Sequence, residues 1–290
     1  MPSQGAAPTA DGASPVQLLI ERAAAAPEHP WLFFRRGLDW RWLSYRQVAD
    51  QVARSTKALR DWAEDMRAQG LQTPRVAVDP RPLPDALVAT LAAATSGLEA
   101  EAVDPASGVE VFTPPAARSN LDRWEAEPLE PVTAIEGTES RLWFRDDDGA
   151  PLRSVLPAGS VAAAEALTDT LPPPAGARPI LMSGADLGAS RLQALAAWTL
   201  GADAAWVLEP QKDAFAATVL WVRPTHLVAR GDDFEDLARD WDRRASKQSR
   251  LVAVVTVVGE DGPSATASET RFGVPEVPFP EPPGSSAEGA

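Results

Sequence analysis

The sequence predicts an α/β fold made of two lobes with mostly parallel, helix-flanked sheets. Two observations carry this prediction. Short apolar runs alternate with segments of helical periodicity through most of the 290 residues, and residues 251–258 are apolar at nearly every position. This alternation is typical of parallel sheets covered by helices, whose strands are buried on both faces.

Composition divides the chain into four parts. The two ends, residues 1–13 and 275–290, are rich in Pro, Gly, Ser and Ala and lack the apolar surface that offsets ordering entropy, so we expect disordered tails. Between them we expect a first lobe over residues 14–138, which ends in a Pro- and Glu-rich connection, and a second lobe over residues 139–274.

Local signals define the elements of the first lobe. Ser14 is a typical N-cap before Pro15, so a helix is expected to begin there. Apolar runs on both sides of residues 37–39 predict a hairpin. Ser44 and Gln47 form a capping box that opens a long amphipathic helix. A β-α-β unit is then expected from a strand at 75–78, a helix at 84–95 and a strand at 98–103.

The second lobe repeats the alternation. Predicted strands at residues 141–145 and 152–156 flank an Asp-Asp-Asp-Gly sequence, which is typical of a hairpin turn. Asp186 is the expected N-cap of a later helix, and Gly201 is expected to follow that helix. The other strands are expected at 179–182, 204–208, 225–228 and 251–258, and the helices at 160–170, 187–199, 212–221 and 234–243.

Composition also excludes several classes of function. The chain has 41 acidic and 27 basic residues, a formal net charge of −14, no cysteine, and only two histidines, His29 and His226. Thiol catalysis and cysteine-based or multi-histidine metal centres are therefore excluded, and the charge disfavours nucleic acid as a partner. We find neither an apolar run of about 20 residues nor a secretory signal pattern, so we expect a cytoplasmic protein without a membrane partner.

Several segments together resemble the N-terminal part of the AMP-binding superfamily. These adenylate-forming enzymes include acyl-CoA synthetases, luciferases and peptide-synthetase adenylation domains. The order and spacing of the segments carry the resemblance, since none is specific alone. The segments are residues 18–27, 42–45, 75–78, 103–105, 198–202 and 223–227.

The resemblance fails at the loop that binds ATP phosphates in this superfamily. The family loop reads Thr-Ser-Gly-Thr-Thr-Gly-x-Pro-Lys-Gly, and residues 144–153 read Phe-Arg-Asp-Asp-Asp-Gly-Ala-Pro-Leu-Arg. Carboxylates stand in place of hydroxyls, and leucine stands in place of lysine. The degenerate phosphate-loop positions are Arg145, Asp146, Asp147, Asp148, Gly149, Pro151, Leu152 and Arg153. The residues favour a simple hairpin turn, and the alternative is a metal–nucleotide site in which a divalent ion bridges the carboxylates to phosphate.

Other family positions are also absent. The family's Tyr-Gly-x-Thr-Glu segment is expected after residues 271–275, but Glu-Val-Pro-Phe-Pro follows instead. Residues 184–186 replace the family's histidine in its Pro-Leu-x-His segment, and the chain ends before the family's ribose-binding aspartate and catalytic lysine. The resemblance therefore implies a truncated, degenerate member that covers the N-terminal portion only.

Three further groups of residues have structural interpretations. The acids at 232–236 are expected to cap a helix rather than bind a divalent ion, since acids favour the N-terminal end of a helix. His226 is expected to be a hydrogen-bonded core residue, and His29 an exposed loop residue. Ten tryptophans favour ordinary core packing, with an aromatic interface as the alternative.

These observations favour a non-catalytic pseudoenzyme that acts as a binding or scaffolding subunit. We expect no catalytic residue, no metal and no cofactor, and we expect a protein partner or self-association. One alternative is part of a split ATP-dependent acyl-activating enzyme, an acid–thiol ligase whose missing motifs a partner chain supplies. Another alternative is a sensor that binds a small acyl ligand.

Overall fold

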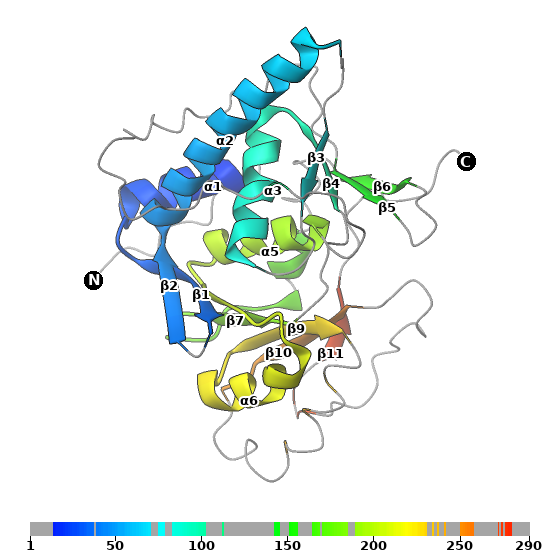
Figure 1. Ribbon diagram of the computed structural model, residues 1–290. Coiled ribbons are helices and arrows are strands. Elements are labelled where there is room, and N and C mark those ends of the chain that lie inside the picture. The colour runs from blue at the N-terminus through cyan, green and yellow to red at the C-terminus, as the bar shows by residue number, and fades with distance from the viewer. Residues whose placement is uncertain are drawn as a thin grey trace.

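The computed structural model confirms an α/β fold built on two sheets (Figure 1). A seven-stranded sheet has the order β11-β10-β9-β7-β8-β1-β2, and a four-stranded sheet has the order β3-β4-β5-β6. The residues that the structure describes are 14–37, 39–70, 75–78, 83–102, 112, 142–145, 151–155, 164–168, 170–184, 189–230, 234, 237, 241, 250–257, 272, 274 and 276–279.

The seven-stranded sheet is parallel except at one edge, where β1 and β2 form an antiparallel hairpin. The prediction of mostly parallel strands is therefore confirmed for this sheet. Its strands are β1 (Pro30–Arg36), β2 (Asp39–Ser44), β7 (Ile180–Ser183), β8 (Ala205–Leu208), β9 (His226–Arg230), β10 (Ala253–Val257) and β11 (Glu276–Pro278).

The four-stranded sheet begins with the predicted β-α-β unit. Strands β3 (Arg75–Val78) and β4 (Glu99–Ala102) are parallel, and α3 (Pro84–Ser96) connects them. Gly97 ends this helix with φ +66°, a left-handed conformation that favours glycine. Strands β5 (Leu142–Arg145) and β6 (Pro151–Val155) complete the sheet, with β5 parallel to β4. Beside this sheet the Phe112 N–H donates to the carbonyl oxygen of Ala77, in β3, at 2.7 Å.

Two boundaries differ from the sequence predictions. The predicted division at residues 138/139 does not match the sheets, because the early strands β1 and β2 join the sheet of the second half and the later strands β5 and β6 join the sheet of the first half. The predicted C-terminal tail over 275–290 is also wrong in part, since β11 pairs with β10 in parallel and Phe279 is buried. An apolar Val277 packed against the core and an edge position that tolerates Pro278 explain this strand.

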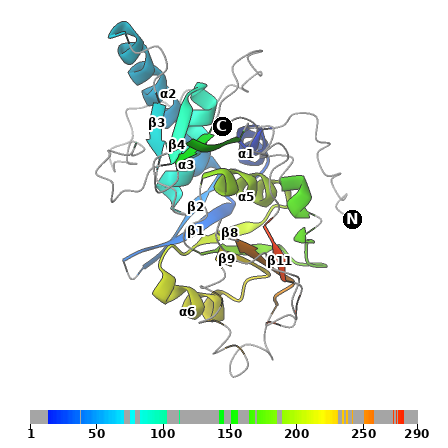
Figure 2. The ribbon, with the colours of Figure 1, turned by 90° about the vertical axis from the view of Figure 1, so that its right-hand side faces the viewer.

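Helices cover both faces of the seven-stranded sheet. Helices α1 (Pro15–Ala25), α3 and α5 (Ala189–Gly201) lie on one face, α2 (Tyr45–Ala68) packs beside α3, and α6 (Lys212–Val222) lies on the other face (Figures 1 and 2). Gly201 is the last residue of α5 rather than the residue after it. Arg22 of α1 stabilises this end, because its guanidinium donates to the carbonyl oxygens of Leu200 and Gly201 at 2.7 and 2.8 Å. No helix among the described residues is long and apolar enough to cross a membrane.

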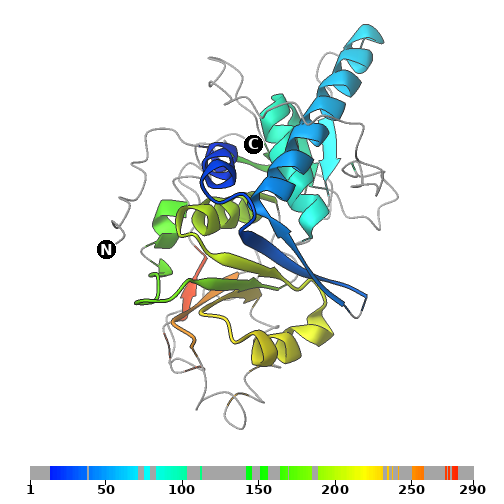
Figure 3. The same cartoon turned by 90° about the vertical axis from the view of Figure 1, so that its left-hand side faces the viewer.

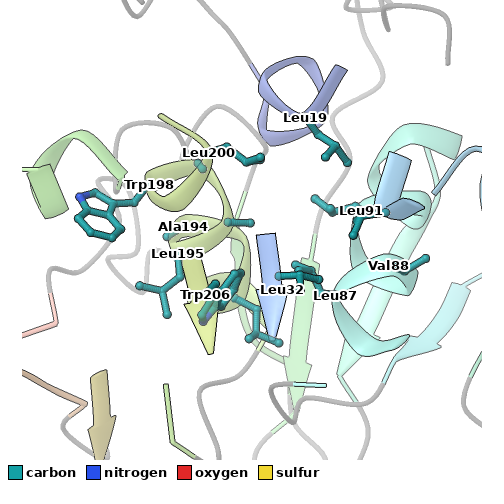
Figure 4. Packing of buried hydrophobic residues seen from close by; sticks show 14 of the residues in the cluster. Leu19, Leu32, Leu87, Val88, Leu91, Ala194, Leu195, Trp198, Leu200 and Trp206 are labelled. Carbon is teal, nitrogen blue, oxygen red and sulfur yellow. The ribbon is translucent and has the colours of Figure 1, made fainter. Parts of the chain in front are cut away.

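The main core fills the space between α1, α3, α5 and the sheet. Leucines from the three helices converge on the strands, where the Trp206 ring lies next to α5 (Figure 4). A second core lies under α6, on the opposite face of the sheet. Its buried aromatic side chains are Phe215, Phe234, Trp241 and Phe272.

The capping box of α2 is present as predicted. The Ser44 hydroxyl accepts from the Gln47 N–H at 3.2 Å, and the Gln47 side chain accepts from the Ser44 N–H at 2.9 Å.

Replacing Ser44 with Ala is expected to lower the free energy of unfolding by about 1 kcal/mol. The Gln47 N–H loses its acceptor, and the reciprocal bond between the Ser44 N–H and the Gln47 side chain loses its support. Urea unfolding would measure this, and Ser44→Thr, which keeps the acceptor oxygen, should lose less. Equal losses in both variants would contradict the capping role.

Candidate functional site

The β5–β6 hairpin holds the positions of the predicted phosphate loop. The two strands are antiparallel, and Arg145 is in register with Pro151 at the loop end. The hairpin interpretation of the flanking strands is thus confirmed. Arg145, Pro151, Leu152 and Arg153 lie on these strands, whereas residues 146–150, which include the three aspartates and Gly149, lie outside the described residues.

Leu152 occupies an irregular position in this hairpin. The register pairs Phe144 with Arg153 and Arg145 with Pro151, so in the described ladder Leu152 is the extra residue of a bulge. Bulges re-aim a side chain and are over-represented near functional sites. Bulges are also common at sheet edges, and β6 is an edge strand of its sheet, so the bulge fits either origin.

The carboxyl ends of the parallel strands form the second candidate region. Ligands bind at this edge in open α/β sheets. The ends of β7, β8 and β9 are joined, because the Gly184 N–H donates to the Val228 carbonyl at 2.9 Å and the Glu209 N–H donates to the Ser183 carbonyl at 3.1 Å. The Ser183 hydroxyl is buried and accepts from the Trp206 indole N–H at 2.9 Å.

Glu209, directly after β8, is a buried carboxylate that the sequence analysis missed. It is only 1% exposed, and it accepts from the Thr218 hydroxyl at 2.9 Å and from the Gln211 N–H at 3.2 Å. The Nε of Arg35 lies 3.8 Å from Oε2, the same carboxylate oxygen that accepts from Thr218. Both carboxylate oxygens are thus occupied within the chain, so Glu209 fixes α6 to the sheet edge. A charged residue directly after a four-residue apolar run is the sequence signal that marks such a position.

His226 is a hydrogen-bonded core residue, as predicted. Its Nε2 lies 3.0 Å from the Pro172 carbonyl oxygen, and its Nδ1 lies 2.8 Å from the Thr225 hydroxyl. A neutral ring that donates from Nε2 and accepts at Nδ1 satisfies both contacts. His29 is half-buried, not exposed as predicted, because its ring lies over Tyr45.

Burial makes folding sensitive to the charge on His226. Burial lowers the pKa of His226, against an opposing effect of the hydrogen bond to Pro172. Below about pH 6.5 the unfolded chain therefore binds a proton that the folded chain does not, and stability falls as pH decreases, by at most about 1.4 kcal/mol per pH unit. Urea unfolding at roughly pH 7.5 and 5.5 should show a smaller loss in His226→Gln than in wild type. An equal loss would contradict this origin.

A partly buried polar cluster joins segments that are far apart in the sequence. The Tyr45 hydroxyl donates to the Asp203 carboxylate at 2.8 Å, and the Arg178 guanidinium lies 3.4 Å from that hydroxyl. Burial, followed by the hydrogen bond to Asp203, raises the pKa of Tyr45, so the hydroxyl stays protonated. No sequence pattern predicted this cluster.

Among the described residues no group of three or more His, Asp or Glu side chains is arranged to hold a metal ion. All four acids that were expected to cap a helix, at positions 232, 233, 235 and 236, lie outside the described residues.

The sequence matches no protein-family model and no curated protein. Solved structures match it over most of its length. An AMPPNP-bound form of the nonribosomal peptide synthetase FmoA3 has a TM-score of 0.62 at 16% identity, over 90% of this chain and 30% of that chain. The N-terminal domain of FACL13 from Mycobacterium tuberculosis has a TM-score of 0.60 at 12% identity, over 87% and 71%. A fatty acyl CoA synthetase from Mycobacterium tuberculosis has a TM-score of 0.59 at 13% identity, over 84% and 54%.

The chain has the N-terminal fold of the adenylate-forming enzymes. It spans less than a third of the FmoA3 chain and about half of the fatty acyl CoA synthetase. At these identities the likeness establishes the adenylate-forming fold and leaves activity, substrates and partners as matters for proposal.

Proposed function

We propose that this chain is a non-catalytic member of the adenylate-forming fold that acts as a binding or scaffolding subunit. The observation that carries the proposal is the composition of the β5–β6 hairpin, which has Asp146, Asp147 and Asp148 in place of a glycine and two threonines and Leu152 in place of lysine. We infer that this loop does not bind ATP phosphates.

Electrostatics support the inference. Two unit charges about 4 Å apart interact by roughly 4 kcal/mol at an effective dielectric constant near 20. Three carboxylates that face a polyphosphate would therefore repel it by several kcal/mol. Arg145 and Arg153 offset part of this repulsion, but the Leu152 position contributes no compensating charge.

ATP–pyrophosphate exchange tests the proposal on the purified chain. We expect no exchange above background with any member of a panel of carboxylic acids, while an acyl-CoA synthetase assayed in parallel exchanges readily. An acid-dependent exchange that increases with protein concentration would overturn the non-catalytic proposal.

Part of a split acyl-activating enzyme is the second candidate function. It rests on the fold shared with the fatty acyl CoA synthetase, of which this chain covers 54%. In this case a separate chain supplies the remaining segments, and co-expression with that chain should produce exchange activity that neither chain has alone. If the two chains neither co-purify nor exchange together, this candidate fails.

A further inference from the structure

Strand β2 is an edge strand of the seven-stranded sheet, and no described strand pairs with its outer side. It stands at one end of the strand order, and β1 is its partner in the described part of the chain. Figure 3 shows the β1–β2 hairpin at the margin of the sheet, near α6. An edge strand presents unpaired backbone N–H and C=O groups, which are able to pair with another strand.

Tryptophans gather on one face of this edge. Trp40 of β2 stacks on Trp221 of α6 at a centroid distance of 5.2 Å and an interplanar angle of 13°. Trp42 lies two residues further along β2 and therefore on the same face. Trp221 is 67% exposed and Trp42 is 49% exposed. Among the described residues, these two are the exposed large hydrophobic side chains. Exposed aromatic groups of this kind are typical of association surfaces.

The opposite face of β2 carries charges of alternating sign. Asp39 and Arg41 are exposed, with their charged atoms 3.4 Å apart. In an antiparallel pairing of two β2 strands centred on Trp40, Asp39 of each copy stands opposite Arg41 of the other. Residues directly opposite in such a pair interact, and opposite charges there are stabilising.

We propose that two copies of this chain associate through antiparallel pairing of their β2 strands, centred on Trp40, to give one continuous sheet. This inference is independent of the proposed loss of catalysis. The charges select the register, because centring on Arg41 places the two Arg41 side chains opposite each other, and like charges there are destabilising. The Trp40 register also brings Trp42 diagonally next to Trp40 of the second copy, within reach of an aromatic side chain.

Charge reversal on the edge tests the pairing. Asp39→Arg gives a strand with two positive charges, and Arg41→Asp gives one with two negative charges, so each variant repels its own copies. Sedimentation velocity should show a dimer for wild type and a dissociation constant raised about tenfold or more for each variant. Asp61→Arg, the same change on the exposed face of α2, should leave the dimer intact.

Mixing the two variants distinguishes specific pairing from general damage. An equimolar mixture of Asp39→Arg and Arg41→Asp should form a mixed dimer, because every opposed pair is then of opposite sign, and the double variant Asp39→Arg/Arg41→Asp should dimerise with itself. Circular dichroism melts would verify that each variant is folded. A monomeric wild type at the highest concentrations reached, or a mixture that stays monomeric while wild type dimerises, would overturn the proposal.

Discussion

Replacing Trp206 with alanine is expected to lower the free energy of unfolding by about 3–5 kcal/mol. Trp206 is fully buried in β8, at the centre of the main core, and its ring lies 6.3 Å from the Trp31 ring. The substitution leaves a large cavity and also removes the donor to the Ser183 hydroxyl, at the end of the neighbouring strand β7. Urea unfolding followed by far-ultraviolet circular dichroism would measure the loss.

Trp221→Ala is the matched control for this experiment. Trp221 is mostly exposed, and its ring stacks on the Trp40 ring. We expect a loss of about 1 kcal/mol or less, since surface substitutions remove little buried area. If Trp206→Ala and Trp221→Ala lowered the free energy of unfolding equally, the result would contradict the placement of Trp206 in the core.

Replacing Arg178 with methionine is expected to cost about 2–4 kcal/mol of stability. Its guanidinium donates to the carbonyl oxygens of Asp203 at 2.8 Å and of Pro30 at 2.9 Å, and it also contacts Tyr45. These bonds tie the start of β1 and the start of α2 to the turn before β8. Methionine keeps most of the apolar volume but leaves the two carbonyl groups without this partner.

Arg46→Met is the control for Arg178. Arg46 forms an exposed ion pair with Glu28 at 3.1 Å. Exposed pairs contribute about 0–1 kcal/mol, so the control should unfold at nearly the wild-type urea concentration. If Arg46→Met destabilised the chain as strongly as Arg178→Met, the loss would reflect the removed charge rather than the partly buried bonds to the carbonyl groups.

Local signals explain what the sequence predicted well. The caps at Ser14 and Ser44 lie where expected, because capping depends on a few neighbouring residues. The interleaving of β1 and β2 with strands of the second half was missed, since strand pairing between distant segments leaves no local pattern. Strand β11 was missed because its proline-rich composition is typical of a tail, while its pairing with β10 is a tertiary contact.

The candidate site was predictable to a similar degree. The Asp-Gly turn sequence was enough to predict the β5–β6 hairpin. Alignment with the family's phosphate loop singled out Leu152 as the position where the family has lysine. The bulge at Leu152 depends on the register between two strands, which residue types alone do not specify. The Tyr45–Asp203 bond was missed because the two residues are 158 positions apart in the sequence. Glu209 was missed although it directly follows the apolar run of β8, which is the local signal that marks it.

Calorimetric titration of the purified chain with MgATP tests the central claim most directly. We expect no saturable heat from wild type, because the loop carries three carboxylates and no lysine. The variant Asp146→Gly/Asp147→Thr/Asp148→Thr/Leu152→Lys, which restores the family residues, is the matched comparison and should bind MgATP more tightly. Saturable binding of MgATP by wild type, with a Kd below about 1 mM, would contradict the account.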